Sequence, residues 1–340
     1  MGTSPAQKLD ASPTVVLRQQ DVRRLLSMPD CIAAVERAFD SHARGEALGP
    51  AVVGVHVEGG GFHVKAAGLR FANESAVFAA KINANFPGNP STHGLPTIQG
   101  VLGLFDARNG RVLALMDSIE ITSLRTAAAT AVAAKHLASP IADVVICGCG
   151  EQSRHQLRAL ACVRPVARVR AFDIDDARAT RFAADMGREL SVDASAIADL
   201  ARARDATVWI TCTPSHRWFL GREQVSPGAF VAAVGADNPE KQEIEPALLA
   251  ANVVIADILD QSATIGDLHH AIDGGLMRRE NVRGELGDVV SGRIRGRSSD
   301  DEIVIFDSTG TALQDVAAAA VVYERAVARG DGVAIDLCDG

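Results

Sequence analysis

Aromatic residues and long apolar runs are scarce in this chain, and basic residues do not outnumber acidic ones. Aromatic residues make up 4% of the 340 residues, with one tyrosine and two tryptophans. No uncharged apolar run approaches the roughly 18 residues that a membrane-spanning helix needs. The formal net charge is -8, and no cluster of lysine and arginine offers the basic surface that nucleic acid requires. We therefore expect neither a membrane nor a nucleic acid among its partners.

Cysteine is too scattered for a disulfide framework. Only Cys147 and Cys149 lie close together, and in a chain of this length such usage is typical of reduced cytoplasmic thiols. The polar N-terminal residues 1–14 lack the apolar core of a secretory signal and predict a flexible tail. The length suggests two domains, and 47% apolar with 22% charged residues is an ordinary globular balance. We expect a cytoplasmic globular protein.

The first 118 residues predict helices followed by an antiparallel sheet. Residues 17–47 are typical of two short helices, the second with apolar residues at helical spacing. Short alternating stretches follow at residues 51–58, 61–69, 77–87 and 97–117. The last stretch contains DARNGR, a hairpin signal, so neighbouring strands are expected to pair antiparallel.

The pattern changes at residues 118–138, SIEITSLRTAAATAVAAKHLA, a long helix rich in alanine and threonine that Ser118 can cap. Beyond it, strand-like and helical segments alternate, and a final helix at residues 312–330 ends at Gly330. The strand-like segments are nearly continuous apolar runs, at residues 143–148, 168–173, 206–213, 229–236, 252–257 and 302–307. Such runs indicate a parallel sheet covered on both faces, and therefore an α/β fold.

A glycine turn lies in the stretch 143–156, DVVICGCGEQSRHQ. Gly148 and Gly150 stand between an apolar strand and a helix. The first permits a tight turn, and the second lets a pyrophosphate approach the helix N-terminus. Ser153 replaces the third glycine of the usual G-x-G-x-x-G pattern, so the motif alone is weak. A turn that binds nothing remains an alternative.

The next strand favours a dinucleotide at this turn. It ends in Asp173, about 20 residues later, where a carboxylate accepts hydrogen bonds from ribose hydroxyls. That carboxylate would repel a 2′-phosphate, so we expect NAD, with nearby Arg178 leaving NADP as a minority alternative. A metal site at Cys147, Cys149 and His155 is disfavoured, because no second pair of ligands stands at zinc spacing. We expect no metal.

Three long motifs resemble the ornithine cyclodeaminase/mu-crystallin family, which includes an archaeal-type alanine dehydrogenase and reductases of cyclic ketimines. They are residues 94–138, 234–244 (VGADNPEKQEI) and 298–326, within a match from about residue 16 to 330. The resemblance implies a Rossmann NAD-binding domain at residues 123–310. It also implies an α+β substrate-binding and dimerisation domain with an antiparallel sheet, at residues 1–122 and 311–340, and a homodimer in which two subunits pair their sheets.

The resemblance assigns catalytic and substrate-binding roles to three residues. Arg125 would bind the substrate α-carboxylate, for which a bidentate guanidinium is the natural partner. Lys81 would contact the carboxylate or carbonyl, and Asp237 would act as the acid/base group. Each residue also has a plainer interpretation, as a solvated helix arginine, an outward-facing strand lysine, and a turn or helix-cap aspartate.

His63 and Lys65 depart from the family pattern. Ornithine cyclodeaminases carry a glutamate where His63 aligns, the alanine dehydrogenase relative carries an arginine there, and methionine followed by proline is usual where Lys65 stands. The two residues are two apart on a predicted strand, so they share one face. With Arg125 and Lys81 they predict a pocket suited to a second carboxylate or a hydroxyl on the substrate. The alternative is that both side chains face solvent on an edge strand.

The resemblance also implies which residues contact the cofactor. They are Gly148, Gly150, Glu151, Gln152, Asp173, Thr126, Thr213, Ser308 and Gly310. Thr126 and Thr213 would lie near the ribose or pyrophosphate, and Ser308 and Gly310 near the nicotinamide. Asp307 and Asp315 are interpreted as structural caps or ion-pair partners.

These observations lead to three hypotheses of function. The first is an NAD-dependent oxidoreductase that exchanges hydride at the α-carbon of a small amino or imino acid. The second is a lyase of the ornithine cyclodeaminase type, in which NAD is recycled within each turnover; the missing acid at His63 argues against it. The third is a crystallin-like nucleotide-binding protein without turnover, which the presence of Arg125, Lys81 and Asp237 disfavours.

Overall fold

Two β-sheets and the helices between them make up the protein. The computed structural model describes residues 13–70, 76–138, 140 and 142–337. The predicted N-terminal tail falls almost entirely on residues 1–12, outside the described residues. None of the helices in the described ranges is long and apolar enough to cross a membrane.

The first sheet has seven strands and confirms the antiparallel sheet predicted for the N-terminal part. Across the sheet they run β17 (Val333–Ile335), β1 (Thr14–Leu17), β6 (Val112–Asp117), β5 (Ile98–Asp106), β4 (Ala76–Asn85), β3 (Gly60–Arg70) and β2 (Ala47–Val57). All neighbours are antiparallel except β1 and β6. In the β3–β4 register, Lys65 lies opposite Lys81 and His63 opposite Asn83.

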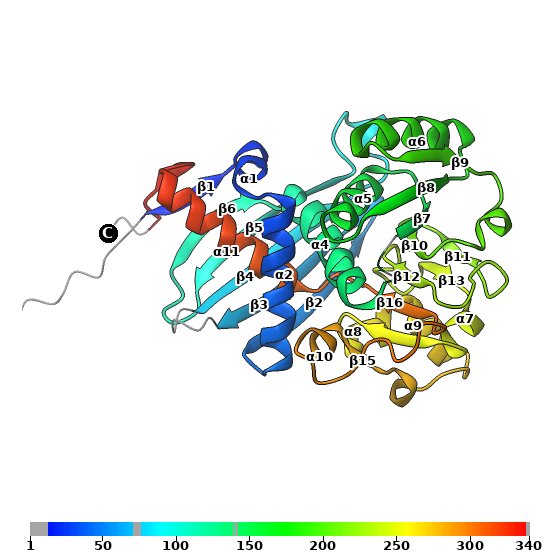
Figure 1. Cartoon of the computed structure of the whole chain (residues 1–340). Coiled ribbons are helices and arrows are strands. Elements are labelled where there is room, and N and C mark those ends of the chain that lie inside the picture. Colours follow the sequence, from blue (N-terminus) through cyan, green and yellow to red (C-terminus); the bar gives the residue numbers. More distant parts are fainter. Residues whose placement is uncertain (1–12, 71–75, 139, 141, 338–340) are drawn as a thin grey trace, which may run out of the picture.

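One face of this sheet is covered by helices from both ends of the chain (Figure 1). They are α1 (Gln19–Leu25), α2 (Met28–Ala43) and α11 (Ala312–Arg329). Ser27 caps α2 by accepting from the Asp30 backbone N–H, and Phe39 and its apolar neighbours face the core. The helix α11 ends at Gly330, as predicted, and Gly330 adopts the left-handed conformation there. The last helix therefore returns the chain to the sheet built by its first hundred residues.

The long alanine-rich helix α4 (Ser118–Leu137) joins the two sheets. It follows β6 directly, and most of its residues are buried. Asp117, rather than the predicted Ser118, caps the helix by accepting from the backbone N–H groups of Ile119 and Glu120. Ser118 is instead the first helical residue, and its hydroxyl donates to Asn83. The small side chains of α4 allow neighbouring helices and strands to approach it closely.

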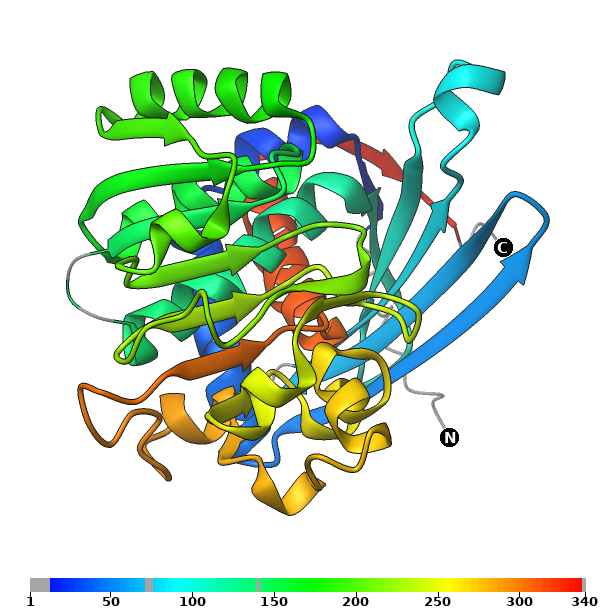
Figure 2. The same cartoon turned by 90° about the vertical axis from the view of Figure 1, so that its right-hand side faces the viewer.

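The second sheet is entirely parallel and confirms the predicted Rossmann-type α/β architecture. Its strand order is β15 (Gly284–Glu285), β14 (Val253–Ala256), β16 (Val304–Asp307), β12 (Phe230–Ala233), β10 (Val208–Thr211), β7 (Ala142–Cys147), β8 (Val166–Phe172) and β9 (Asp193–Ala196). The central strands are buried on both faces, as continuous apolar runs require. Figure 2 shows their carboxyl ends pointing toward the antiparallel sheet.

Further elements connect the strands within the two sheets. They are α3 (Asn89–Thr92), α5 (Glu151–Val163), α6 (Asp176–Leu190), α7 (Pro246–Ala250), α8 (Leu259–Ile265), α9 (Asp267–Asp273), α10 (Leu286–Val290) and the small parallel pair β11 (His216–Leu220) and β13 (Gln242–Ile244). A continuous hydrophobic core runs from the antiparallel sheet through α4 to one face of the parallel sheet. A second core covers the other face of the parallel sheet.

We expect Phe39→Ala to destabilise the protein by about 3–5 kcal/mol, because Phe39 is fully buried between α2 and the core and its loss leaves a cavity. Urea unfolding followed by circular dichroism would measure the change. Arg37→Ala on the exposed side of the same helix is the matched control and should change stability by less than about 0.5 kcal/mol. Equal losses in the two variants would contradict this assignment of the core face.

Candidate active site

A cleft of about 800 Å³ lies where the two sheets meet. One wall comes from β2 and β3, and the other from the loops that follow β12 and β14. Among the predicted site residues, His63 and Asp237 line this cleft. Gln261, on α8, also lines the cleft. Its side-chain amide donates hydrogen bonds to the Thr309 hydroxyl and the Gly310 carbonyl, in the loop after β16. The carboxyl ends of parallel strands are the usual place for ligands in such folds.

Arg125 and Lys81 meet deeper in the protein, on a shared carboxylate. Arg125 Nε donates to Oδ1 of Asp315 at 2.9 Å, and Lys81 Nζ lies 2.9 Å from Oδ2. The three side chains are 5%, 3% and 1% exposed. The solvated interpretations of Arg125 and Lys81 are therefore wrong, and Asp315 is the ion-pair partner that the sequence suggested. Gln314 accepts a further hydrogen bond from Arg125 Nη1.

The charge on Lys81 is finely balanced. Burial, reinforced by the nearby Arg125 guanidinium, lowers the pKa of Lys81 to about 7 even though Asp315 opposes this shift. Burial acts to raise the pKa of Asp315, but Arg125 and Lys81 outweigh it and hold that pKa below its usual value. An anionic ligand beside Lys81 would favour its protonated form.

Lys65 is a third buried cation in this region. Its Nζ donates to the backbone carbonyls of Thr309 and Gly310, at 3.1 and 2.6 Å. Strand β3 lies between β2 and β4, so it is not an edge strand, and Lys65 is only 9% exposed. Burial, together with the charge of Arg125, lowers the pKa of Lys65. The interpretation of both β3 residues as solvent-facing is wrong for Lys65, and His63 is half-buried in the cleft wall.

Asp237 follows β12 and stands at the mouth of the cleft. Its Oδ1 accepts from Lys241 Nζ at 2.7 Å. Desolvation in the cleft acts to raise the pKa of Asp237, but the ammonium groups of Lys241 and Lys65 outweigh it and keep the pKa below its usual value. The carboxylate is therefore ionised at neutral pH. Desolvation lowers the pKa of His63, and the charge of Asp237 offsets part of this shift. The imidazole is therefore neutral at neutral pH.

The glycine turn has the geometry of a dinucleotide site. Gly148 adopts φ +89°, and a Cβ there would lie 2.6 Å from the Cys212 carbonyl oxygen, so a larger residue does not fit. Gly150 directly precedes α5 and has open space on its Cβ side. Ser153, in place of the third glycine, is buried and donates to the Gly148 carbonyl. The turn thus leaves room for a phosphate at the N-terminus of α5.

Asp173 lies beside this turn, at the end of β8. Its Oδ2 accepts from the Cys149 backbone N–H at 2.8 Å, and its Oδ1 accepts from the Asp175 backbone N–H at 2.9 Å. Arg178 lies 3.7 Å from the carboxylate on the solvent side. Each carboxylate oxygen retains acceptor capacity for a ribose hydroxyl.

The other predicted cofactor residues differ in how well they are placed. Ser308 is buried and its hydroxyl has no hydrogen-bond partner among the described residues, so a ligand could satisfy it. Gly310 has φ +75°, and a Cβ there would lie 2.5 Å from Arg125 Nη1. Gln152 donates to the Ser123 carbonyl of α4, whereas Glu151 is exposed on the first turn of α5. Thr126 is half-buried next to Arg125.

Buried carboxylates, which the sequence analysis missed, fix the loops around the site. Glu243 accepts from the backbone N–H groups of Thr213 and Gly235, at 2.6 and 2.8 Å. Asp257 accepts from the Thr309 hydroxyl and the Gly310 backbone N–H, both at 2.8 Å. Burial raises the pKa of both carboxyl groups. These contacts fix the loops after β10, β12 and β16. No local sequence pattern indicates them, because each carboxylate contacts residues that are distant in sequence.

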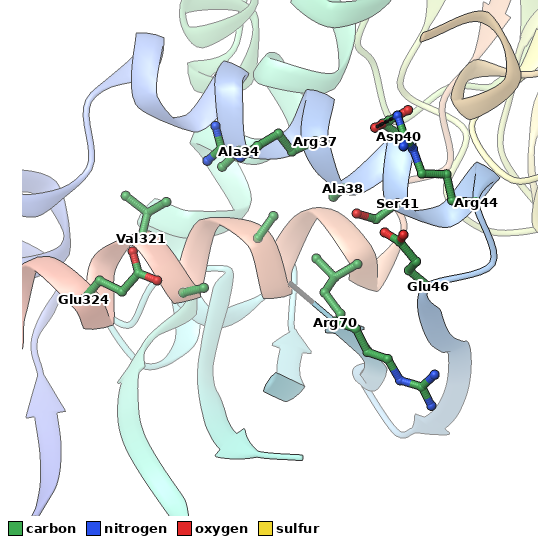
Figure 3. A pocket seen from close by; sticks show the side chains of 13 residues that line it. Ala34, Arg37, Ala38, Asp40, Ser41, Arg44, Glu46, Arg70, Val321 and Glu324 are labelled. Atoms are coloured by element: carbon green, nitrogen blue, oxygen red, sulfur yellow. Dashed lines mark ion pairs between the residues drawn. The ribbon is translucent and has the colours of Figure 1, made fainter. Parts of the chain in front are cut away.

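Two other features lie apart from this site. A cavity of about 670 Å³ between α2 and α11 holds none of the predicted site residues, and Asp40 pairs there with Arg44 (Figure 3). Cys147 and Cys149 pack in different hydrophobic cores, as expected for side chains that diverge. Within the described ranges, no cluster of three histidine, cysteine or acidic side chains could hold a metal ion.

Comparison with known proteins places these features in a family. The profile of the ornithine cyclodeaminase/mu-crystallin family matches residues 12–330. The chain is 37% identical to an alanine dehydrogenase of Archaeoglobus fulgidus over 329 residues, which cover 94% of this chain and 97% of that protein. It is 35% identical to an iminosuccinate reductase of Paracoccus denitrificans over 326 residues, which cover 95% of this chain and 100% of that protein.

Solved structures agree with this result. An archaeal alanine dehydrogenase dimer with bound NAD superposes with a TM-score of 0.90 at 36% identity, covering 95% of this chain and 99% of that one. The iminosuccinate reductase of Paracoccus denitrificans in complex with NAD+ gives a TM-score of 0.88 at 34% identity, covering 96% and 100%.

We expect Asp315→Asn to destabilise the protein by about 3–5 kcal/mol, because it removes the carboxylate that, among the described residues, pairs with both Lys81 and Arg125. Chemical denaturation would measure this. The control is Asp40→Asn, which breaks an exposed pair with Arg44 and should cost less than about 1 kcal/mol. A stability equal to that of the control would mean that the buried cluster does not hold α4, β4 and α11 together.

Proposed function

The chain belongs to the ornithine cyclodeaminase/mu-crystallin family, and from that premise we propose that it is an NAD-dependent oxidoreductase acting on small amino and imino acids. It exchanges hydride at the substrate α-carbon. The observation that carries this proposal is the buried cluster of Arg125, Lys81 and Asp315, in a chain that also has a glycine turn that fits a dinucleotide and Asp237 in the wall of the cleft. Relatives whose names or structures include NAD and amino or imino acids support it.

NAD fits the residues that are present. The open side of Gly150 accommodates a pyrophosphate, and Asp173 suits the ribose hydroxyls. The partnerless Ser308 hydroxyl and the close approach of Gly310 to Arg125 suit the nicotinamide end. When bound there, NAD supplies or accepts the hydride. The carboxylate of Asp173 favours NAD over NADP, because a 2′-phosphate would meet a negative charge.

The substrate is held by the buried cations. Arg125 can offer its guanidinium edge to the α-carboxylate, and Lys81 can add a second charge-assisted hydrogen bond. Because Asp315 already orients both cations, little freedom is lost when the substrate binds. A carboxylate ligand also raises the pKa of Lys81 from about 7, which makes the protonated form dominant in the complex.

Asp237 manages the proton on the substrate nitrogen. Lys241 and Lys65 keep Asp237 ionised and also make it a weak base, so it is suited to accept the proton only as that proton leaves the substrate ammonium during oxidation. In the reductive direction, the same negative charge stabilises the protonated imine that receives the hydride. His63 stands nearby as a neutral imidazole and can contribute a hydrogen bond without adding charge.

Two domains would divide these tasks. We propose that residues 1–122 and 311–340 form the substrate-binding and dimerisation domain and residues 123–310 the NAD-binding domain. Support comes from the two separate sheets. It also comes from α11, which follows the strands of the parallel sheet in the sequence but packs on the first sheet. The five described cysteines are free thiols, which supports a reducing compartment, the cytoplasm.

A cyclodeaminase reaction is the second candidate, because the family contains such enzymes. It needs a partner for the distal ammonium of a diamino acid. The cleft is lined by His63, and the nearby buried cation is the Lys65 ammonium, which would repel a second ammonium group. The oxidoreductase is therefore favoured. A nucleotide-binding protein without turnover is less favoured still, because Arg125, Lys81 and Asp237 are all in place.

A homodimer is also proposed, through the sheet face that faces away from α11. Val55 lies opposite Phe62, and Ile82 lies opposite Val101, so their side chains share this face. It carries exposed apolar side chains, namely Val53, Val55, Val57, Phe62, Ile82 and Val101, each 39–56% exposed. An uncovered apolar face of this kind marks an interface, and a second copy of the same sheet is complementary to it.

We expect purified protein to oxidise NADH in the presence of a small 2-oxo acid and ammonium, with the corresponding amino acid as product. Asp237→Asn should lower kcat by about 100- to 10,000-fold, because the amide cannot accept the proton. NADH affinity, measured by fluorescence titration, should be unchanged.

Asp273→Asn, an exposed aspartate on α9, is the control and should match the wild type. Undiminished turnover by Asp237→Asn would remove Asp237 from the mechanism. Release of ammonia from a diamino acid without net change in NADH would identify the cyclodeaminase reaction instead.

We expect wild-type protein to sediment as a dimer and Val55→Asp to shift it toward the monomer, because a charge placed on the paired apolar face opposes its burial. Sedimentation velocity measures the shift. Leu276→Asp, on a loop away from the sheet with 55% of the residue exposed, should leave the dimer intact. A dimer that tolerates Val55→Asp would place the interface elsewhere.

A further inference from the structure

Lys65 is a buried ammonium that makes no hydrogen bond to a carboxylate among the described residues. Lys81 and Arg125 both pair with Asp315, whereas the hydrogen-bond acceptors of Lys65 in the described residues are two neutral carbonyls, of Thr309 and Gly310. An ammonium has three donors, so one remains to be used. Burying a charge without a counter-ion is costly unless a ligand compensates for it. Asp237, Asp315 and Asp257 act on this ammonium only through longer-range attraction, so its third donor is available to an anionic group of a ligand.

The side chains of Lys65 and Lys81 begin at opposite positions of two neighbouring strands but extend in different directions. They face each other across β3 and β4, so their Cβ atoms lie about 5 Å apart on one face of the sheet. Lys81 reaches toward α4 and α11, where Thr122 and Asp315 accept from it. Lys65 reaches toward the loop after β16. The two ammonium groups are thus held apart by separate partners. Two carboxylates of one short molecule could therefore each bind a different ammonium group.

Two residues that line the cleft lie next to Lys65 in the structure or on its strand. Gln261 lines the cleft and donates to the Gly310 carbonyl, the same oxygen that accepts from Lys65. His63, two residues before Lys65 on the same face of β3, also lines the cleft. If the α-carboxylate of a substrate lies at Arg125 and Lys81, a short substrate side chain would extend toward His63 and Lys65.

We propose that Lys65 determines specificity by binding a second carboxylate, so that the substrates are short 2-imino and 2-amino dicarboxylic acids. This inference rests on the proposed function and names its substrate class. In the reductive direction the imine carbon gains the hydride from NADH, the nitrogen gains a proton from solvent, and NAD and the amino dicarboxylate leave. Both carboxylates are unchanged by the reaction and serve only for binding.

The same contacts explain which substrates are rejected. A methyl side chain leaves the third donor of the Lys65 ammonium without an acceptor, and sites built around such a hydrogen bond reject analogues that lack the partner. An ammonium side chain meets a like charge. We therefore expect the four-carbon dicarboxylate to exceed its three-carbon monocarboxylate analogue in kcat/KM by about 100-fold or more.

The test compares oxaloacetate and pyruvate, each with ammonium and NADH, and identifies aspartate or alanine by chromatography. Wild-type protein should favour oxaloacetate. Lys65→Met should lower kcat/KM for oxaloacetate by about 100-fold or more and leave the value for pyruvate within about 10-fold. The control is Lys135→Met, which replaces a surface lysine paired with Glu36 and should preserve the wild-type preference.

A second measurement needs no variant, in case Lys65→Met does not fold. Succinate should inhibit the wild-type enzyme competitively, at a concentration at least about 10-fold below that required of propionate. A wild-type preference for pyruvate, equal inhibition by the two acids, or equal losses with both substrates in Lys65→Met would overturn the inference. Equal losses would mean that Lys65 binds the α-carboxylate. Reduction of other imines but of neither of these would also overturn it, whereas no NADH oxidation with any imine would reject the proposed function itself.

Discussion

The carboxylate of Asp315 is the contact on which the site depends. It joins α11, at the end of the chain, to Lys81 on β4 and to Arg125 on α4, and all three side chains are buried. Two cations could not remain this close in a dry interior without it, because their mutual repulsion and desolvation would be uncompensated. The same contact orients the groups that we assign to the substrate α-carboxylate. The packing of the last helix therefore also places the side chains that we propose as the anion site.

A second set of carboxylates performs the corresponding task on the parallel sheet. Glu243 holds the backbone of the loops after β10 and β12, and Asp257 holds the loop after β16. Loops at strand ends are otherwise the most mobile parts of such a fold. Fixing their backbone N–H groups to buried acceptors limits how far Asp237 and Gly310 can move. The positions at which a hydride donor and its acceptor must meet are thereby restrained before any ligand arrives.

Much of the fold and part of the candidate site follow from short-range patterns. Alternating runs and apolar runs predicted both sheets, and the glycine turn with Asp173 predicted where a dinucleotide fits. Motif resemblance supplied Arg125, Lys81 and Asp237, which no periodicity could have singled out. The cap of α4 was assigned one residue too late, because Asp117 and Ser118 are both good caps and only the backbone geometry distinguishes them. Lys241, Glu243, Gln261 and Asp257 were missed altogether.

The sequence by itself determined the order of strands and helices, the position of the glycine turn and the residue types available for chemistry, since each depends on neighbours within a few residues. Tertiary structure alone decided that Lys65 is buried and that Lys81 meets a carboxylate 234 positions away. Burial and ion pairing arise between segments that are distant in sequence, so their electrostatic consequences cannot be derived from local pattern. For this protein, those consequences are the basis on which we propose a substrate preference in addition to nucleotide binding.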